Sequence, residues 1–312
     1  MNEYFSLVDF TSALDRLSPY IRRTPTLDVT LDNGLPVTLK LENLQVSGSF
    51  KIRGAMNTVL GLDPAKLERG LVTASGGNHG MGVATAGTIT GTPTTIHLPE
   101  NTPQGKIDKL RTIATEVIVK GAVWDDANAL ALAAEREQGK TYIHPFADKT
   151  VIEGQGTITL ELLKQAPELD TLLVAIGGGG LIAGVASAAK LINPDIRIIG
   201  IEAEGAPTLH DSLKEGKLVT LERIATRAGT LAPRCSAPLN LEIISGHVDD
   251  ILLVSDQAME ESAKWLWSAC GIATELAAAA AIAALRSGTY QPAKNEKTGV
   301  IICGAGPDGF AD

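Results

Sequence analysis

The feature that most restricts the fold is an alternation of short apolar runs with helical stretches between residues 71 and 203. The apolar runs are rich in β-branched residues and lie at 71–74, 94–98, 116–119, 141–144, 172–176 and 196–201. Helical patterns begin between them, near Asn78, Pro103, Trp124, Thr150 and Leu181. Strands and helices that alternate in this way form mostly parallel sheets covered by helices on both faces. We therefore predict an α/β fold, with a last strand at 299–303.

Composition favours the same class and limits the partners. Aromatic residues make up only 4% of the 312 residues, and a core of small aliphatic side chains suits helices packed on a sheet. The net charge is −9 with both signs mixed, so no basic block can follow a nucleic-acid backbone. The alanine-rich run 276–285 is shorter than the ~20 residues of a membrane span. We therefore expect neither a nucleic-acid partner nor a membrane. The first ten residues lack a signal-peptide pattern, which predicts a cytoplasmic protein.

Ligands of open parallel sheets bind where strands end and helices begin, and four glycine-containing segments are expected there. The first, 47–55, reads SGSFKIRGA and places Lys51 at the start of a predicted helix. A helix N-terminus disfavours a further positive charge and so favours the neutral amine, which can form an imine with an aldehyde. The alternative is an exposed lysine in a polar loop.

Two further segments offer turns with polar side chains. The segment 74–80 reads ASGGNHG, in which glycines let a ligand approach the backbone and Ser75 and Asn78 supply hydrogen-bonding groups. An ordinary capped turn explains this segment equally well. The segment 301–306 reads IICGAG, and taken alone its Cys303 is a buried structural thiol.

The remaining segment is a run of four glycines, 177–180, which follows an apolar strand. Consecutive amides at a helix N-terminus form a cradle for phosphate. A second interpretation is a dinucleotide site, because Gly178, Gly180 and Ala183 fit the glycine fingerprint and Glu202 ends the next strand. On this segment alone a nicotinamide-dependent oxidoreductase therefore stays open, as does a tight structural turn.

Taken together and in order, these segments resemble the fold-type II pyridoxal phosphate enzymes, within them the serine/threonine dehydratase and serine racemase branch. The strings SFKIRGA, SGGNHG and GGGGL occur in family order, with HPFAD at 144–148 and EGQGT at 153–157. The resemblance runs from about Leu17 to the last residue. A dinucleotide site would leave Lys51 and Asn78 without a role, so this interpretation ranks below the pyridoxal phosphate one.

The resemblance implies pyridoxal 5'-phosphate as the cofactor and a role for each segment. Lys51 would hold the cofactor as a Schiff base and act as the base at the substrate Cα. Phe50 would pack against the pyridine ring, Asn78 would bond its 3-hydroxyl, and Cys303 would face its nitrogen. The phosphate would be bound by the residues of the glycine turn, Gly177, Gly178, Gly179, Gly180 and Leu181. The carboxylate side of the substrate would be lined by Ser75, Gly76, His79 and Gln155.

Two positions depart from the pattern of the branch. The racemases carry a second serine after Ser75, which serves as the acid/base of the opposite face, and here that residue is Gly76. The metal site of the family uses two acidic side chains and a carbonyl. A threonine replaces one carboxylate here, so we expect no metal at the corresponding residues, Glu202, Ala206 and Thr208.

A third departure lies at 225–229, where ATRAG replaces the usual Ala-Asp-Gly of the branch. Arg227 or Arg234 is either a plain surface charge or a group that recognises an unusual substrate side chain. The sequence ends just after the last predicted strand, so we expect no regulatory domain.

The resulting expectation is an ammonia-lyase that converts L-threonine, L-serine or a related 3-hydroxy amino acid to a 2-oxo acid and ammonia. Its fold would be two open, mostly parallel twisted sheets flanked by helices, as in the tryptophan synthase β chain. A small domain, 70–147, would be inserted into a large cofactor-binding domain, 1–69 and 148–312, in a homodimer. The alternatives are a serine racemase, a hydroxyaspartate or phenylserine dehydratase, a nicotinamide-dependent oxidoreductase, and a cofactor-free binding protein.

Overall fold

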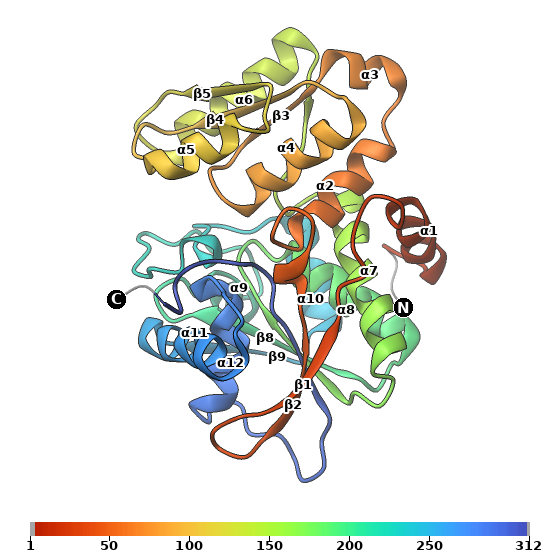
Figure 1. Cartoon of the computed structure of the whole chain (residues 1–312), viewed down its shortest axis with the longest axis vertical. Coiled ribbons are helices and arrows are strands. Elements are labelled where there is room, and N and C mark those ends of the chain that lie inside the picture. Colours follow the sequence, from red (N-terminus) through yellow and green to blue (C-terminus); the bar gives the residue numbers. More distant parts are fainter. Residues whose placement is uncertain (1–3, 311–312) are drawn as a thin grey trace.

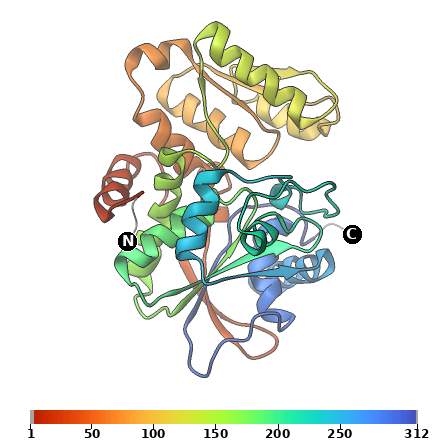
Figure 2. The same ribbon diagram turned by 180° about the vertical axis from the view of Figure 1, so that it is seen from behind.

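A computed structural model describes residues 4–310, and these form two sheets with helices packed around each. The larger sheet has six strands in the order β1-β2-β10-β7-β8-β9, and the smaller has four in the order β5-β4-β3-β6. Figures 1 and 2 show the two sheets from opposite sides, with the smaller sheet and its helices above the larger. The predicted α/β class with two mostly parallel sheets is confirmed.

The larger sheet is parallel except for one edge. Its strands are β1 (Thr26–Thr30), β2 (Pro36–Lys40), β7 (Thr171–Ala175), β8 (Arg197–Ala203), β9 (Asp250–Val254) and β10 (Thr298–Ile301). Strand β1 pairs with β2 in antiparallel register, and every other neighbouring pair is parallel. Strands β1, β2 and β9 fall outside the predicted set. Strand β1 alternates polar and apolar residues and so lacks the continuous apolar run that marks β7 and β8, whereas β9 carries such a run at 251–254 and was nevertheless not predicted.

The smaller sheet is parallel throughout. Its strands are β3 (Leu71–Ala74), β4 (Thr94–Leu98), β5 (Glu116–Val119) and β6 (Thr141–Tyr142). Strand β6 is shorter than the predicted run 141–144, because the chain turns at His144, whose ring bonds the backbone that follows. All four strands lie within the predicted range 70–147, although the domain boundary itself stays a prediction.

Helices cover both faces of the larger sheet, with α11 and α12 on one side and α7, α8 and α10 on the other (Figure 1). The helices are α1 (Leu7–Leu17), α2 (Lys51–Leu60), α3 (Pro64–Arg69), α4 (Asn78–Thr90), α5 (Gln104–Arg111), α6 (Trp124–Gln138), α7 (Lys149–Gln165), α8 (Gly180–Ile192), α9 (Thr208–Glu215), α10 (Pro238–His247), α11 (Asp256–Cys270) and α12 (Leu276–Arg286), with the 3-10 turns η1 (Glu42–Leu44) and η2 (Gly229–Leu231). The apolar run 276–285 lies in α12 and is buried. Within residues 4–310, no helix is both long and apolar enough to cross a membrane.

Helix α2 is fixed by a close crossing with α7. A Cβ added to Gly54 would lie 2.5 Å from Nε2 of Gln155, and one added to Gly154 would lie 2.6 Å from Cα of Gly54. Both distances are shorter than any real contact of a Cβ atom, so only glycine lets the two backbones meet. This crossing fixes the position of α2 against α7 at Gly54, one turn after Lys51.

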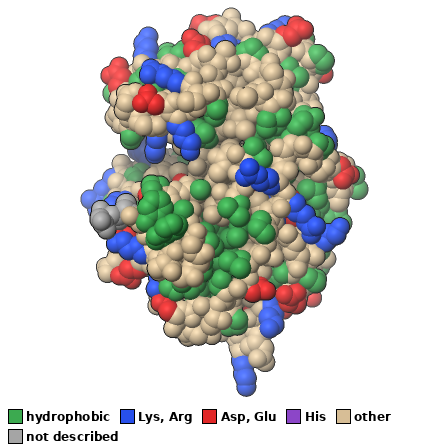
Figure 3. All heavy atoms as spheres, viewed as in Figure 1, with side chains coloured by type: hydrophobic (Ala, Val, Ile, Leu, Met, Phe, Trp, Pro, Cys, Tyr) green, Lys and Arg blue, Asp and Glu red, His purple; other side chains and the backbone are tan. Residues whose placement is uncertain are grey.

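Charged side chains of both signs are spread over the face drawn in Figure 3, without a block of one sign. This distribution agrees with the mixed charge pattern of the sequence.

Candidate active site

The four predicted segments meet at the carboxyl ends of the strands. The backbone N–H of Phe50 donates to the carbonyl of Cys303 at 3.1 Å, so the first and last segments run side by side. Asn78, in the second segment, lies 3.0 Å from the position of a Cβ on Gly304. Thr230, in η2, lies within 4 Å of where a Cβ on Gly77 or on Gly177 would stand. It therefore lies between the second and third segments.

Lys51 is the first residue of α2 and its amine has a specific partner. Its Nζ donates to the carbonyl of Pro145 at 2.6 Å and lies 5.1 Å from the ring centroid of Phe50. Burial lowers the pKa of this amine to about 8, against the opposing effects of Cys303 and Glu275. The neutral amine expected at a helix start is therefore favoured mainly by burial. An appreciable fraction is uncharged near neutral pH and can attack an aldehyde.

Asn78 begins α4, and its amide is oriented by a carboxyl group absent from the predicted site. Nδ2 of Asn78 donates to Oε1 of Glu275 at 2.7 Å. Burial raises the pKa of Glu275 to about 7, and the hydrogen bonds from Asn78 and Thr230 oppose this shift. Glu275 is the residue before α12. In the sequence it reads only as the polar start of an alanine-rich helix, so no local signal marks it.

The turn 177–180 accepts only glycine at several positions. A Cβ on Gly178 would lie 2.2 Å from Cδ1 of Phe146, and one on Gly180 would lie 2.6 Å from the Phe146 carbonyl. Gly179 has a φ of +91°, in the left-handed region. The carbonyl of Gly178 accepts hydrogen bonds from Asn240 Nδ2 at 2.7 Å and Ser236 Oγ at 2.9 Å. The turn is thus held rigidly at the N-terminus of the long helix α8, where an anion such as phosphate is stabilised.

Cys303 and Leu181 line the same region from within the core. Leu181 is 6% exposed and Cys303 is 3% exposed. Burial raises the pKa of the Cys303 thiol, so the group is neutral. A neutral thiol can share only a weak hydrogen bond with a ring nitrogen.

The residues predicted for the carboxylate side of the substrate differ in how open they are. Ser75 accepts a hydrogen bond from the Gly77 amide at 3.3 Å, and a Cβ on Gly76 would lie 3.1 Å from a methyl carbon of Thr102. The other two are buried. His79 bonds the carbonyl of Ile143 at 2.9 Å, and burial lowers its pKa to about 3. Gln155 is 1% exposed, at the crossing of α2 and α7.

The residues that correspond to the metal site of the family do not fit a hard cation. The two carboxylate oxygens of Glu202 accept the backbone amides of Leu209 (2.9 Å) and His210 (2.8 Å), and burial raises the pKa of this carboxyl to about 8. The hydroxyl of Thr208 donates to the Pro233 carbonyl, and Ala206 is buried beside them. Both oxygens of this carboxyl are already engaged at the start of α9, and burial disfavours the negative charge that such a cation requires. Across the part of the chain described, no group of three His, Cys, Asp or Glu residues could hold a metal.

Arg227 and Arg234 have partners away from the glycine turns. Arg227 is 61% exposed and pairs with Glu260 at 2.7 Å, and Arg234 donates to the carbonyl of Leu221 at 2.9 Å. These contacts support the interpretation of both residues as surface charges.

A cluster of buried charged residues around α2 was also absent from the predicted site. The Arg53 guanidinium donates to both oxygens of Glu42 and both oxygens of Glu161, at 2.7–2.9 Å. Lys40 Nζ donates to Glu161 at 2.7 Å. The motif SFKIRGA includes Arg53, but the partners come from distant parts of the chain, so the sequence gives this arginine no role.

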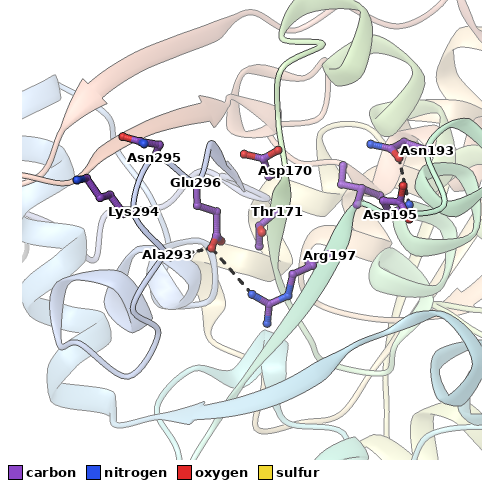
Figure 4. Close-up of a pocket in the computed structure, with 10 residues that line it drawn as sticks. Asp170, Thr171, Asn193, Asp195, Arg197, Ala293, Lys294, Asn295 and Glu296 are labelled. Atoms are coloured by element: carbon purple, nitrogen blue, oxygen red, sulfur yellow. Dashed lines mark hydrogen bonds and ion pairs between the residues drawn. The ribbon is translucent and has the colours of Figure 1, made fainter.

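A separate hollow of about 410 Å³ lies at the opposite end of the larger sheet (Figure 4). Its lining includes Thr171 and Arg197, the first residues of β7 and β8, and Nη1 of Arg197 lies 3.9 Å from Oε2 of Glu296. The glycine turn follows the other end of β7. This hollow is therefore not part of the site at which the four segments meet.

Comparison with known proteins identifies the family. Residues 17–304 match the family model described as pyridoxal-phosphate dependent enzyme. The chain belongs to this family. The L-threonine ammonia-lyase of Thermotoga maritima is 37% identical over 275 residues, which are 88% of this chain and 68% of that protein. The serine racemase of Oryza sativa subsp. indica is 37% identical over 94% of this chain and 88% of its own length.

Solved structures agree with this assignment. Maize serine racemase superposes with a TM-score of 0.91 at 36% identity, covering 97% of this chain and 94% of its own. A threonine deaminase from T.th. superposes with a TM-score of 0.90 at 35% identity, covering 99% of both chains. The predicted resemblance, fold and cofactor are confirmed, and the nicotinamide alternative is set aside.

The residues present fit pyridoxal phosphate. The buried amine of Lys51 suits the aldehyde, and the glycine turn at the start of α8 leaves no room for a Cβ and suits the phosphate. The neutral thiol of Cys303 suits a ring nitrogen that is not forced to carry a proton.

Proposed function

We propose that this protein is an ammonia-lyase that removes water from L-threonine, L-serine or a related 3-hydroxy amino acid and releases a 2-oxo acid and ammonia. The observation that carries the proposal is the amine of Lys51, which has a lowered pKa and donates a hydrogen bond to the Pro145 carbonyl where the glycine segments meet. Membership of the pyridoxal-phosphate dependent family supplies the chemistry. The L-threonine ammonia-lyases of Thermotoga maritima and Geobacter sulfurreducens, 37% and 39% identical, favour this substrate class.

In this proposal the residues around Lys51 bind and orient the cofactor. The bound cofactor supplies an electron-accepting ring that stabilises negative charge at the substrate Cα. The glycine turn and Leu181, at the start of α8, bind the phosphate through backbone amides and the helix dipole. Phe50 would pack beside the ring, and Cys303 would face the ring nitrogen. Asn78 would donate its amide to the 3-hydroxyl, with Glu275 fixing the orientation of that amide.

Lys51 also moves a proton. Its amine, with a pKa of about 8, is suited to accept the Cα proton near neutral pH. Ser75 is proposed to bind the substrate carboxylate. His79 and Gln155, both buried, are proposed to support the wall behind it. No divalent cation is needed in this arrangement.

Serine racemase is the second candidate, and the solved maize structure and the rice sequence favour it. Racemisation requires an acid/base group on each face of Cα. Lys51 serves one face, and Gly76 has no side chain with which to serve the other. We therefore propose a dehydratase with little racemase activity.

We further propose that the chain works in the cytoplasm as a homodimer. Cys235, Cys270 and Cys303 are all free, which is typical of reducing compartments. Leu44 and Val46 are exposed next to the segment of Lys51, and we propose that this face contacts the second chain. Size-exclusion chromatography with light scattering tests the dimer, and a monomeric mass would contradict it.

The reaction is tested with L-threonine, L-serine, 3-hydroxyaspartate and 3-phenylserine, by measuring 2-oxo acid and ammonia. D-serine and pyruvate formed from L-serine are measured in the same tube. We expect 2-oxo acid from at least one substrate and far more pyruvate than D-serine. Racemisation as fast as elimination would support the second candidate, and no product from any of them would contradict both.

A further inference from the structure

The connecting segment 144–147 joins β6 to α7 and contacts both halves of the candidate site. The carbonyl of Pro145 accepts the hydrogen bond from Lys51 Nζ at 2.6 Å. The ring of Phe146 fills the space beside Gly178, where a Cβ would lie 2.2 Å from Cδ1. Two adjacent residues of this segment, Pro145 and Phe146, therefore contact the amine and the glycine turn respectively.

The backbone of this segment is held by the imidazole of His144. Its Nδ1 accepts the amide of Phe146 at 3.1 Å and that of Ala147 at 2.8 Å. A ring nitrogen accepts hydrogen bonds only when it carries no proton, so the ring is neutral with its proton on Nε2. Burial lowers the pKa of His144 to about 4, which agrees with this state. The ring also packs edge-on against Phe146, with centroids 4.8 Å apart.

Holding these amides fixes two carbonyl groups. A peptide unit is planar and trans, so its N–H and C=O point in opposite directions. The Phe146 amide shares a plane with the Pro145 carbonyl, which accepts from Lys51. The Ala147 amide shares a plane with the Phe146 carbonyl, which accepts from Asn240 Nδ2 at 3.2 Å. The same Asn240 nitrogen donates to the Gly178 carbonyl at 2.7 Å.

We propose that His144 is a positioning residue whose single ring nitrogen aligns the Lys51 amine with the phosphate-binding turn. It acts through the Pro145 carbonyl on one side and through the Phe146 carbonyl and Asn240 on the other. The inference rests on the proposed roles of Lys51 and the glycine turn. His144 itself needs no contact with cofactor or substrate.

Two variants of His144 separate the loss of the hydrogen-bond acceptor from the loss of the aromatic ring. His144→Phe keeps an aromatic ring of similar size and removes the acceptor. His144→Asn removes the ring but keeps an acceptor, because Oδ1 of asparagine is bonded to Cγ, as Nδ1 of histidine is. Tyr142→Phe is the matched control, since it deletes a 2.6 Å hydrogen bond to Asn128 just before the same segment and away from the site.

The measurements are the dissociation constant of pyridoxal phosphate and the hydrogen exchange of the Phe146 and Ala147 amides in the apoprotein. We expect His144→Phe to raise the dissociation constant at least ~10-fold and to speed exchange by a similar factor, since two hydrogen bonds are lost. His144→Asn should stay within about threefold of wild type, and Tyr142→Phe should not change. Wild-type values in His144→Phe would overturn the inference. Equal losses in both His144 variants would also overturn it, because packing of the ring would then be the cause.

A measurement on the wild-type apoprotein decides the question even if His144→Phe does not fold. Nitrogen NMR of ¹⁵N-labelled histidine near pH 7 should show His144 neutral, with the proton on Nε2. A proton on Nδ1 would overturn the inference. If instead the wild-type protein fails to bind pyridoxal phosphate, the proposed function is wrong, while the tautomer of His144 can still be read.

Discussion

Replacing Arg53 by methionine is expected to destabilise the fold by about 3–5 kcal/mol, because it leaves a buried charge without its partner. Arg53 is fully buried and donates to all four carboxylate oxygens of Glu42 and Glu161. Lys40 adds a second positive charge at 2.7 Å from Glu161. The wild-type cluster thus balances two positive charges with two negative ones, and Arg53→Met leaves one negative charge in excess.

The assay is equilibrium unfolding in urea at pH 7, followed by tryptophan fluorescence of the apoprotein. Methionine keeps a long unbranched side chain, so the loss of charge is separated from the loss of volume. Arg227→Met is the matched control. Arg227 also pairs with a carboxylate at 2.7 Å but is 61% exposed. The unfolding midpoint of the Arg227→Met protein should therefore not differ measurably from that of the wild type.

A double variant tests the charge argument itself. Arg53→Met combined with Glu42→Gln leaves Lys40 and Glu161 as a balanced pair, and should recover about 1–3 kcal/mol relative to Arg53→Met alone. The reasoning is refuted if Arg53→Met costs less than about 1 kcal/mol, or if the double variant is less stable than the single one.

Three further changes test individual parts of the site. Cys303→Ser should keep elimination activity and Cys303→Asp should lose most of it, because a carboxylate favours a protonated ring nitrogen; an Asp variant as active as wild type would show that Cys303 is not at the ring. Gly76→Ser should raise the ratio of D-serine to pyruvate formed from L-serine, and an unchanged ratio would contradict the assignment of this position. Treatment with EDTA should leave kcat/KM unchanged, because both oxygens of Glu202 are bonded to backbone amides; a loss restored by magnesium or calcium would contradict this.

The parts of the fold that could be predicted are those set by local sequence. The strands β3, β4, β5, β7 and β8 have runs of apolar and β-branched residues, and all were placed within two residues. The glycine turn could be found because its geometry demands glycine, as the positive φ of Gly179 shows. Strand β1 was missed because its apolar residues alternate with polar ones, whereas β9 was missed although it contains an apolar run at 251–254.

The remainder of the site depends on contacts between distant residues. The partner of Lys51 is 94 residues away, that of Asn78 is 197 away, and Arg53 and Glu161 are 108 apart. No local spacing links such pairs, so the roles of Glu275, His144 and the buried partners of Arg53 could not be inferred from one sequence. The end of β6 was misplaced for the same reason, since the ring of His144 turns the chain there.

The central claim is that Lys51 holds the cofactor. The most direct test is to load the protein with pyridoxal phosphate, reduce it with borohydride, digest it and locate the added pyridoxyl group by mass spectrometry. The account predicts the label on the peptide that contains Lys51, and predicts that a folded Lys51→Ala protein is unlabelled and inactive. A label on another lysine, or wild-type turnover in folded Lys51→Ala, would contradict the account.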